Sequence, residues 1–194
     1  HPLTILGKAR QKINNWFYWT PDEQFFSLEG EENATGRQVL QVTDLGDTPN
    51  PKAEWICDTA EDSGKSMIVW YAHQADGALL EKEFIKRGIT YTTMDSKMNA
   101  EESMARQQSF ENHQVQIFLA HPQKAGSGIT LLAAEIVVYF NNVYSVERRL
   151  QSEDRCHRIG QDHAVSYYDL VYTGTVEKAI YQALMSKIEI GKAI

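Results

Sequence analysis

Gln151, Arg155 and Arg158 have the types and the spacing that a phosphate-binding surface needs. They stand at i, i+4 and i+7, so on a helix they lie within about 60° of one another. One helix face would then present an amide and two guanidinium groups. A guanidinium stays charged and donates two parallel N–H groups to a phosphate, whereas a lysine offers a single point charge. The spacing therefore predicts a helix that binds phosphate.

The helix that carries this face is predicted to span residues 146–158. Ser145 is the expected N-cap and Gly160 the expected C-terminal stop. Asp154 and His157 lie to one side of the two arginines, where their hydrogen bonds could orient the guanidinium groups. Since the helix follows an apolar run, it is expected at the end of a buried strand.

A solvated, charged helix face is the alternative interpretation of this segment. Intrahelical pairs of Glu147 with Arg148 or Arg149 would support it. That interpretation explains Arg148 and Arg149 well. It explains poorly why a face with one glutamine and two further arginines follows a buried strand and ends at Ile-Gly-Gln.

Short apolar runs alternate with helical stretches from residue 51 onward. The apolar runs at 66–72, 89–94, 115–120, 135–140 and 165–171 predict strands. Helical patterns occupy 51–62, 74–88, a segment opened by a capping box of Asn99 and Glu102, the segment after Ser145, and 175–188. Nearly continuous apolar strands that alternate with helices predict an α/β fold whose parallel sheet has helices on both faces.

The loops after the strands are candidate sites, because ligands of open parallel sheets bind outside the carboxyl ends of the strands. The loop after the first strand contains His73, an isolated histidine that favours a surface or packing role over metal binding. The loop after the third strand contains Lys124, Gly126, Ser127 and Gly128. Its glycines let backbone N–H groups approach a phosphate closely. A tight turn from strand to helix needs glycine as well, so the residues leave both interpretations open.

Gly64-Lys65-Ser66 matches the end of a phosphate-binding P-loop, G-x-x-x-x-G-K-[ST]. The first glycine of that pattern is missing, because Thr59 occupies its position. A P-loop also follows a strand and opens a helix, whereas this tripeptide leads into the strand at 66–72. We therefore predict a turn here and no Walker A site in this chain.

Residues 1–50 differ from the rest of the chain and are predicted to form an N-terminal extension to a domain at 51–194. The stretch 5–19 has mixed helical character, and 25–44 has the pattern of two short strands around a polar loop. Aromatic side chains cluster in these two stretches. We expect them to anchor the extension by packing, although they could also stack bases. A run rich in Pro, Gly and Asn at 46–52 marks the boundary.

Composition restricts the function classes. The 194 residues are 42% hydrophobic and 23% charged, which is ordinary for a globular protein. The net charge of −7 argues against a simple DNA-binding module, which usually has a basic surface. Cys57 and Cys156 lack a CxxC partner, which predicts two unpaired thiols in a reducing, cytoplasmic setting. Neither a secretory signal nor an apolar run of about 20 residues is present, and the start at His1-Pro2 indicates a fragment.

The segment QSEDRCHRIGQ, residues 151–161, resembles the last conserved motif of the Swi/Snf-type branch of superfamily-two helicases. That motif reads roughly Q-x-x-D-R-x-H-R-I-G-Q. Its eight fixed positions are matched by Gln151, Asp154, Arg155, His157, Arg158, Ile159, Gly160 and Gln161. Eight matches in eleven residues make the resemblance specific.

Two upstream segments are similar to further motifs of the same family. Residues 124–142 resemble the preceding motif, a glycine turn followed by an apolar strand. Residues 65–110 resemble the opening strand–helix–strand–helix unit of the lobe. The departures from the family pattern are Thr130 in place of asparagine, Ser96 in place of glycine and Ser103 in place of arginine. The resemblance covers about residues 51–187.

The resemblance implies the second of two RecA-like lobes, with ATP and Mg²⁺ bound between them and held mainly by a first lobe that this chain lacks. It assigns arginine fingers to Arg155 and Arg158, and other ATP contacts to Gln151, Asp154 and Gly128. It assigns nucleic-acid contacts to Lys124, Gly126, Ser127 and His73. The implied partners are the first lobe and double-stranded DNA, and residues 1–50 become a connection from that lobe. Alone, the fragment would be inactive.

Two alternatives remain open. One is the lobe of a strand-separating superfamily-two helicase or a restriction-type translocase, and the His-Arg-Ile-Gly-Gln ending counts against it. The other is a non-hydrolysing lobe that binds nucleic acid or protein, which the acidic charge and the missing P-loop fit. A purely structural lobe has no need of two arginine fingers, however. The short chain, the departures in the first motif and the lack of chromatin-reader or zinc-finger features favour a bacterial or phage source.

Overall fold

The computed structural model describes residues 16–19, 41–44, 49–94, 98–122, 129–156 and 161–192. By its internal contacts the chain divides into two compact units, residues 1–50 and 51–194. The role of the first unit as an extension or a connection from another lobe stays a prediction. The two units are described separately below.

The first unit contains one antiparallel pair of strands. Strand β1 (Trp16–Trp19) pairs with β2 (Gln41–Asp44), and Trp16 lies opposite Asp44. β2 lies within the stretch 25–44, for which strands were predicted. The helical interpretation of 5–19 is wrong for β1, because a run of aromatic residues favours extended backbone. The side chains of the aromatic cluster lie outside the described part of the chain, so their packing role stays a prediction.

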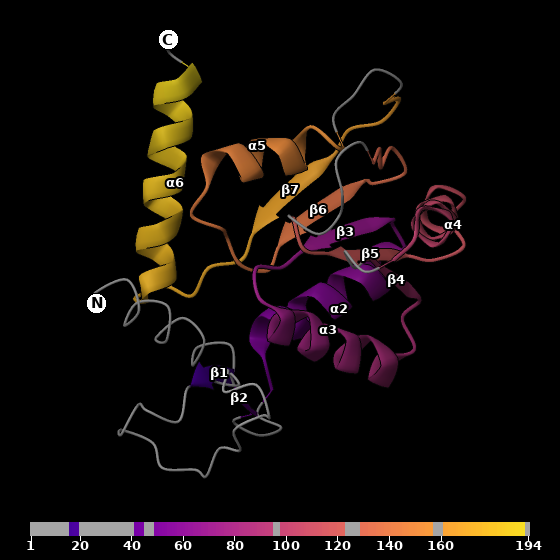
Figure 1. Cartoon of the computed structure of the whole chain (residues 1–194), viewed down its shortest axis with the longest axis horizontal. Helices are drawn as coiled ribbons and strands as arrows, with labels where there is room; N and C mark the ends of the chain where they lie inside the picture. Colours follow the sequence, from indigo (N-terminus) through magenta and orange to yellow (C-terminus); the bar gives the residue numbers. More distant parts are fainter. Residues whose placement is uncertain are drawn as a thin grey trace, which may run out of the picture. The chain divides into compact units, whose positions relative to one another are not determined.

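The second unit is built on a parallel sheet of five strands. The strands are β3 (Met67–Trp70), β4 (Tyr91–Met94), β5 (Ile117–Ala120), β6 (Ile136–Tyr139) and β7 (Ser166–Asp169). Their order across the sheet is β4-β5-β3-β6-β7, and every neighbouring pair is parallel. Each strand lies within an apolar run of the sequence, so the predicted parallel sheet is confirmed (Figure 1).

Helices cover both faces of this sheet, as predicted (Figure 1). The helices are α2 (Pro51–Ser63), α3 (Gln74–Arg87), α4 (Ala100–Glu111), α5 (Val146–Glu153) and α6 (Val176–Lys192). α2 and α3 pack on one face, whereas α4 and α5 lie on the other. α6 follows the edge strand β7 and contacts α5.

Each face of the sheet has its own apolar core, because side chains alternate along a strand. Met67 and Val69 of β3 pack with α2 and α3, while Ile68 and Trp70 pack on the opposite face. All four side chains are fully buried. Burial on both faces explains why the central strand reads as a continuous apolar run.

Local sequence signals mark the start of α4 and the end of α3. Asn99 Oδ1 accepts a hydrogen bond from the Glu102 backbone N–H (2.8 Å), and Glu102 Oε2 accepts one from the Asn99 N–H (3.3 Å). This confirms the predicted capping box. Gly88 ends α3 in the left-handed conformation, with φ of 69°. Glycine adopts that conformation without the steric penalty that a Cβ imposes.

A buried ion pair anchors α6 to the first turn of α2. The Lys52 ammonium donates to Glu177 Oε2 (2.6 Å) and to the carbonyl oxygen of Phe140 (3.0 Å). It also lies 4.6 Å from the centre of the Tyr172 ring. The two charged side chains are 5% and 4% exposed, so each depends on the other for its charge to be satisfied.

Both cysteine thiols are expected to resist alkylation in the folded protein. Cys57 and Cys156 are fully buried and unpaired. Burial raises the pKa of each thiol to about 12, and only the thiolate is a good nucleophile. Treatment with iodoacetamide at neutral pH should leave the mass unchanged, whereas the same treatment in denaturant should modify both residues. Modification of either cysteine without denaturant would contradict this prediction.

Candidate functional site

Buried polar side chains tie together the loops at the carboxyl edge of the sheet. Asn141, just after β6, accepts from the Ala72 backbone N–H (2.7 Å) and donates to Asp76 Oδ2 (2.5 Å). His121, just after β5, contacts the carbonyl oxygen of Ala72 through Nε2 (2.9 Å). Asp76 is fully buried and also accepts from the backbone N–H of His73 (3.2 Å). The described residues that directly follow β3, β5 and β6 are thus held together by hydrogen bonds.

Sequence reasoning placed His73 at this edge but missed Asn141 and Asp76. A signal was available, because Asn141 directly follows a buried strand and Asp76 lies in the first helical turn after another. The backbone of His73 is fixed by Asp76, and its side chain is half-buried. Its contact with nucleic acid stays a prediction.

Helix α5 is shorter than predicted. Ser145 is the N-cap, as expected, and its Oγ accepts from the Arg148 backbone N–H (3.3 Å). The helix ends at Glu153, however, and residues 154–156 form a turn. The carbonyl oxygen of Arg155 accepts from the backbone N–H of Leu131 (3.0 Å). A tertiary hydrogen bond therefore draws the chain out of the helical path that the local sequence favours.

The shorter helix separates side chains that were expected on one face. Gln151 is exposed and donates to Glu147 Oε1 (3.1 Å), and Asp154 is exposed as well. Arg155 is only 7% exposed. Its guanidinium donates to the carbonyl oxygen of Pro122 (3.4 Å) and lies 5.6 Å from the centre of the Trp70 ring. The structure thus brings Arg155 to the ends of β3 and β5, and leaves Gln151 facing solvent.

Other predicted site residues lie outside the part of the chain that the structure describes. They are Lys124, Gly126, Ser127 and Gly128 in the loop after β5, and His157 and Arg158 after α5. Of the two proposed fingers, Arg155 belongs to the described segment 129–156, and Arg158 comes two residues after its end in the sequence. Their roles stay predictions.

The solvated-face interpretation is wrong for Arg149, which is 4% exposed. Its guanidinium forms an ion pair with both carboxylate oxygens of Asp169 at the end of β7. It also donates to Asn142 Oδ1 (2.7 Å) and to Glu153 Oε1 (2.6 Å). Helical spacing gave no signal for this, because Asp169 lies twenty residues away in another element.

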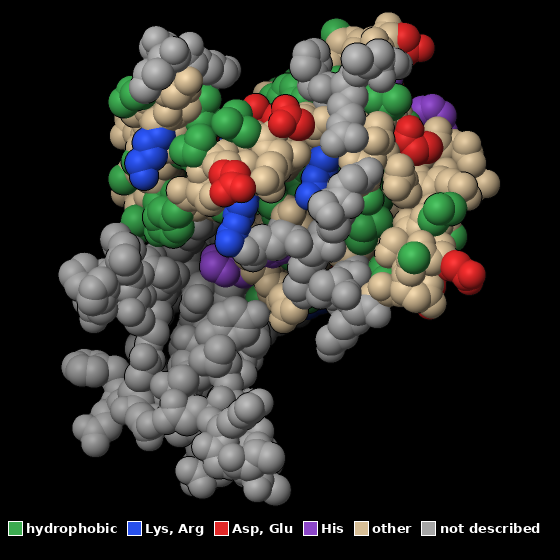
Figure 2. Space-filling model, turned by 45° about the horizontal axis from the view of Figure 1, so that its top comes forward, with side chains coloured by type: hydrophobic (Ala, Val, Ile, Leu, Met, Phe, Trp, Pro, Cys, Tyr) green, Lys and Arg blue, Asp and Glu red, His purple; other side chains and the backbone are tan. Residues whose placement is uncertain are grey.

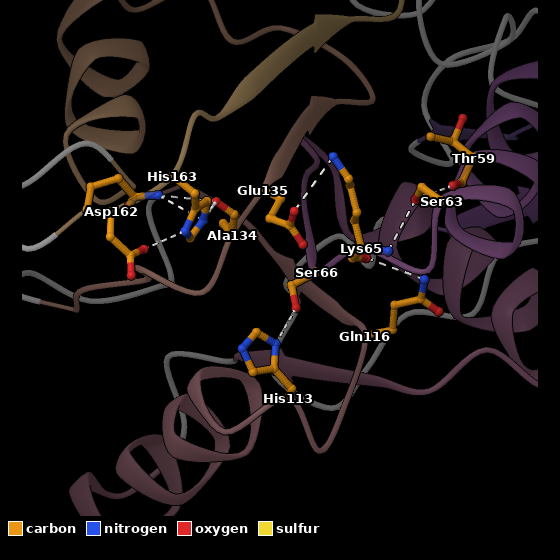
Figure 3. Close-up of polar contacts among 11 residues, drawn as sticks. Thr59, Ser63, Lys65, Ser66, His113, Gln116, Ala134, Glu135, Asp162 and His163 are labelled. Carbon is orange, nitrogen blue, oxygen red and sulfur yellow. Dashed lines mark hydrogen bonds and ion pairs between the residues drawn. The ribbon is translucent and has the colours of Figure 1, made fainter.

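The tripeptide Gly64-Lys65-Ser66 is a turn at the opposite, amino edge of the sheet (Figure 3). Gly64 has φ of 63°, and its backbone N–H closes the last turn of α2. Lys65 Nζ lies 3.6 Å from Glu135, and Ser66 Oγ lies 2.8 Å from Nδ1 of His113. The tripeptide joins a helix to a strand, which is the reverse of a P-loop. The prediction of a turn is confirmed.

Charges of both signs are interspersed on the described surface (Figure 2). On the face that Figure 2 shows, a few Lys and Arg side chains lie among Asp and Glu side chains. Within the described ranges, no group of three His, Cys, Asp or Glu side chains is placed to hold a metal ion. None of the described helices is long and apolar enough to cross a membrane.

Several known proteins are similar to this chain in sequence. Human chromodomain-helicase-DNA-binding protein 6 is 28% identical over 198 aligned residues, which cover the whole chain but 7% of that protein. Human chromatin-remodeling ATPase INO80 is 32% identical over 117 residues, covering 60% of this chain and 8% of its own length. The chain therefore spans less than a tenth of each of these two relatives. Both relatives named here are human proteins. The expected bacterial or phage source of this chain stays a prediction.

The fold and a family match agree with these similarities. The C-terminal part of the Fun30 ATPase domain superposes with a TM-score of 0.64 and 20% identity, over 70% of this chain and 44% of that one. At this identity the match concerns the fold alone. Residues 51–160 match the helicase conserved C-terminal domain. The chain therefore belongs to the helicase conserved C-terminal domain family, as a RecA-like lobe of the Swi/Snf-type branch of superfamily two.

Proposed function

We propose that this lobe supplies arginine fingers to ATP bound on a first lobe of the same parent chain, and that the parent moves along duplex DNA. The observation that carries the proposal is the position of Arg155 within the motif 151–161. This segment contains all eight fixed motif residues and starts on α5. At Arg155 it contacts Pro122 and Trp70, at the carboxyl ends of β5 and β3. Ligands of parallel sheets bind at that edge.

The chemistry of phosphoryl transfer explains why two arginines are needed. The reaction requires stabilisation of charge on the γ-phosphate oxygens more than covalent help. Arg155 and Arg158 would donate to these oxygens, while Gln151, Asp154 and the Gly128 backbone would make further contacts with ATP. Fingers and P-loop would lie on different lobes, so hydrolysis would require the lobes to close. Closure is the motion that couples hydrolysis to movement along DNA.

Arg155 would have to leave its present contacts to reach the nucleotide. Its hydrogen bond to Pro122 is 3.4 Å long, a distance at which such bonds are weak. Exchange of this weak bond for a charged phosphate oxygen would be favourable, because charge-assisted hydrogen bonds are stronger than neutral ones. Lobe closure would therefore draw Arg155 away from the loop after β5.

DNA contacts are proposed for the loops after β3 and β5. Lys124, Gly126 and Ser127 would bind the phosphate backbone, with His73 beside them. Such contacts position a protein on DNA without reading its sequence, and they weaken as salt rises. They would be local, because the chain as a whole carries a net charge of −7.

ATP and Mg²⁺ would be held mainly by the first lobe. The lobe formed by this chain would contribute its two guanidinium groups and the further contacts of Gln151, Asp154 and the Gly128 backbone with the nucleotide. Accordingly, we expect the 194-residue chain to hydrolyse no ATP by itself.

The test is steady-state ATP hydrolysis by the parent protein with no DNA, with duplex DNA and with single-stranded DNA. Strong stimulation by duplex DNA is the result expected of a translocase. Preference for single-stranded DNA would instead indicate a strand-separating helicase. Hydrolysis under no condition would favour the second candidate, a binding lobe, for which the acidic net charge is the supporting observation.

A further inference from the structure

We propose that Arg149 is a positioning residue for the fingers, because it locks α5 onto the ends of β6 and β7. The inference rests on the proposed function of this lobe, since it concerns how Arg155 and Arg158 are aimed. Arg149 itself does not reach the nucleotide in this proposal. It holds α5 (Val146–Glu153), the helix that directly precedes the turn containing Arg155.

Polar contacts, not apolar burial, determine the position of α5. The helix has eight residues, all of them described, and its buried side chains are those of Arg149 and Ser152. Leu150 is 36% exposed and Val146 is half-buried, so neither apolar side chain of α5 is fully buried. A short helix has little stability of its own and depends on tertiary contacts. For α5 the fully buried contacts are made by one guanidinium and one hydroxyl group.

The Arg149 guanidinium uses three of its nitrogens on three partners. Nη1 donates to Asn142 Oδ1 (2.7 Å), Nη2 donates to Asp169 Oδ2 (3.0 Å), and Nε donates to Glu153 Oε1 (2.6 Å). Asn142 Nδ2 in turn donates to Asp169 Oδ1 (2.8 Å). A planar, bidentate fork of this kind fixes direction as well as distance, which the ammonium of lysine cannot do.

Tyr139, the last residue of β6, makes two further contacts with α5. The Arg149 guanidinium carbon lies 3.5 Å from the centre of the Tyr139 ring. The Tyr139 hydroxyl lies 2.7 Å from Ser152 Oγ. Burial raises the pKa of Tyr139, so the phenol stays neutral and keeps its hydrogen bond. Stacking and hydrogen bonding thus fix the rotation of α5 about its axis, just before the chain turns towards Arg155.

Misplacing α5 would affect catalysis more than binding. A displacement of about 1 Å at a catalytic group can cost about 100-fold in rate. Nucleotide binding would suffer less, because ATP is held mainly by the first lobe. Replacement of Arg149 should therefore lower kcat and leave the KM for ATP nearly unchanged.

The experiment uses the parent protein with saturating duplex DNA. Arg149→Lys is expected to lower kcat about 10- to 100-fold with little change in KM, because lysine keeps the charge but loses the fork. Asp169→Asn should act in the same direction, since it removes the carboxylate and keeps the size. Arg148→Lys is the matched control, because Arg148 is adjacent and exposed, and it should retain wild-type kcat. Thermal unfolding of each variant identifies any that is not folded at the assay temperature.

A double-mutant cycle separates positioning from general stability. If Arg149 acts through the fingers, Arg149→Lys should cause little further loss of single-turnover rate in an Arg158→Ala background. An equal loss in both backgrounds, a rise in KM with unchanged kcat, or an unchanged kcat would overturn the inference. The proposed function would fail differently: hydrolysis would then persist when Arg155 and Arg158 are themselves replaced.

Discussion

Replacing Arg158 with alanine is expected to lower DNA-stimulated ATP hydrolysis by the parent protein about 10³- to 10⁵-fold, the range that an arginine finger contributes. The physical reason is that a charge on the γ-phosphate would lose its fixed counter-charge in the transition state. Nucleotide affinity should change little, because the first lobe is proposed to hold ATP. Hydrolysis is measured with and without duplex DNA, and affinity by titration with a fluorescent ATP analogue.

Arg158 is chosen for this test instead of Arg155 because the Arg155 side chain is buried. Arg155 packs on Trp70 and is 7% exposed, so its replacement would disturb the core as well as any catalytic contact. Arg148→Ala is the control for loss of a positive charge near α5. Equal hydrolysis by wild type and Arg158→Ala would refute the finger assignment and favour a non-hydrolysing lobe.

Replacing Lys52 with methionine is expected to lower the free energy of unfolding by roughly 3–5 kcal/mol. The substitution leaves Glu177 buried without its counter-charge, and among the described residues its Oε1 has no hydrogen-bond partner even before the substitution. Loss of this anchor should loosen α6 first. Chemical denaturation of the 194-residue chain, followed by circular dichroism, measures the change.

Two further variants make this prediction specific. Lys52→Met combined with Glu177→Leu should recover much of the loss, because a buried ion pair can often be exchanged for apolar side chains at little cost. Lys65→Met is the matched control: the Lys65 side chain is 53% exposed in its ion pair with Glu135. Such exposed pairs contribute no more than about 1 kcal/mol. A loss from Lys52→Met as small as that from Lys65→Met would contradict the assignment of an anchor.

Local sequence determined the elements of the sheet domain. Local patterns identified all five of its strands. Strands β3, β5 and β6 are continuous apolar runs, because a strand buried on both faces excludes polar residues. Asn99 and Gly88 identified helix boundaries, because capping and left-handed backbone depend on neighbours within four residues. The same local reasoning identified Gly64-Lys65-Ser66 as a turn. The motif at 151–161 identified the family in the same way.

Only the tertiary structure reveals the contacts that orient α5 and attach α6 to α2. Arg149 binds Asp169 twenty residues away, and Lys52 binds Glu177 at a separation of 125 residues. The end of α5 is likewise set by a hydrogen bond between Leu131 and Arg155. Helical periodicity relates only residues within a few turns, so it read Arg149 as solvated and continued α5 beyond Glu153. Periodicity cannot identify partners that the parallel crossovers bring together from distant segments. Here such partners hold α5, the helix that precedes the proposed fingers.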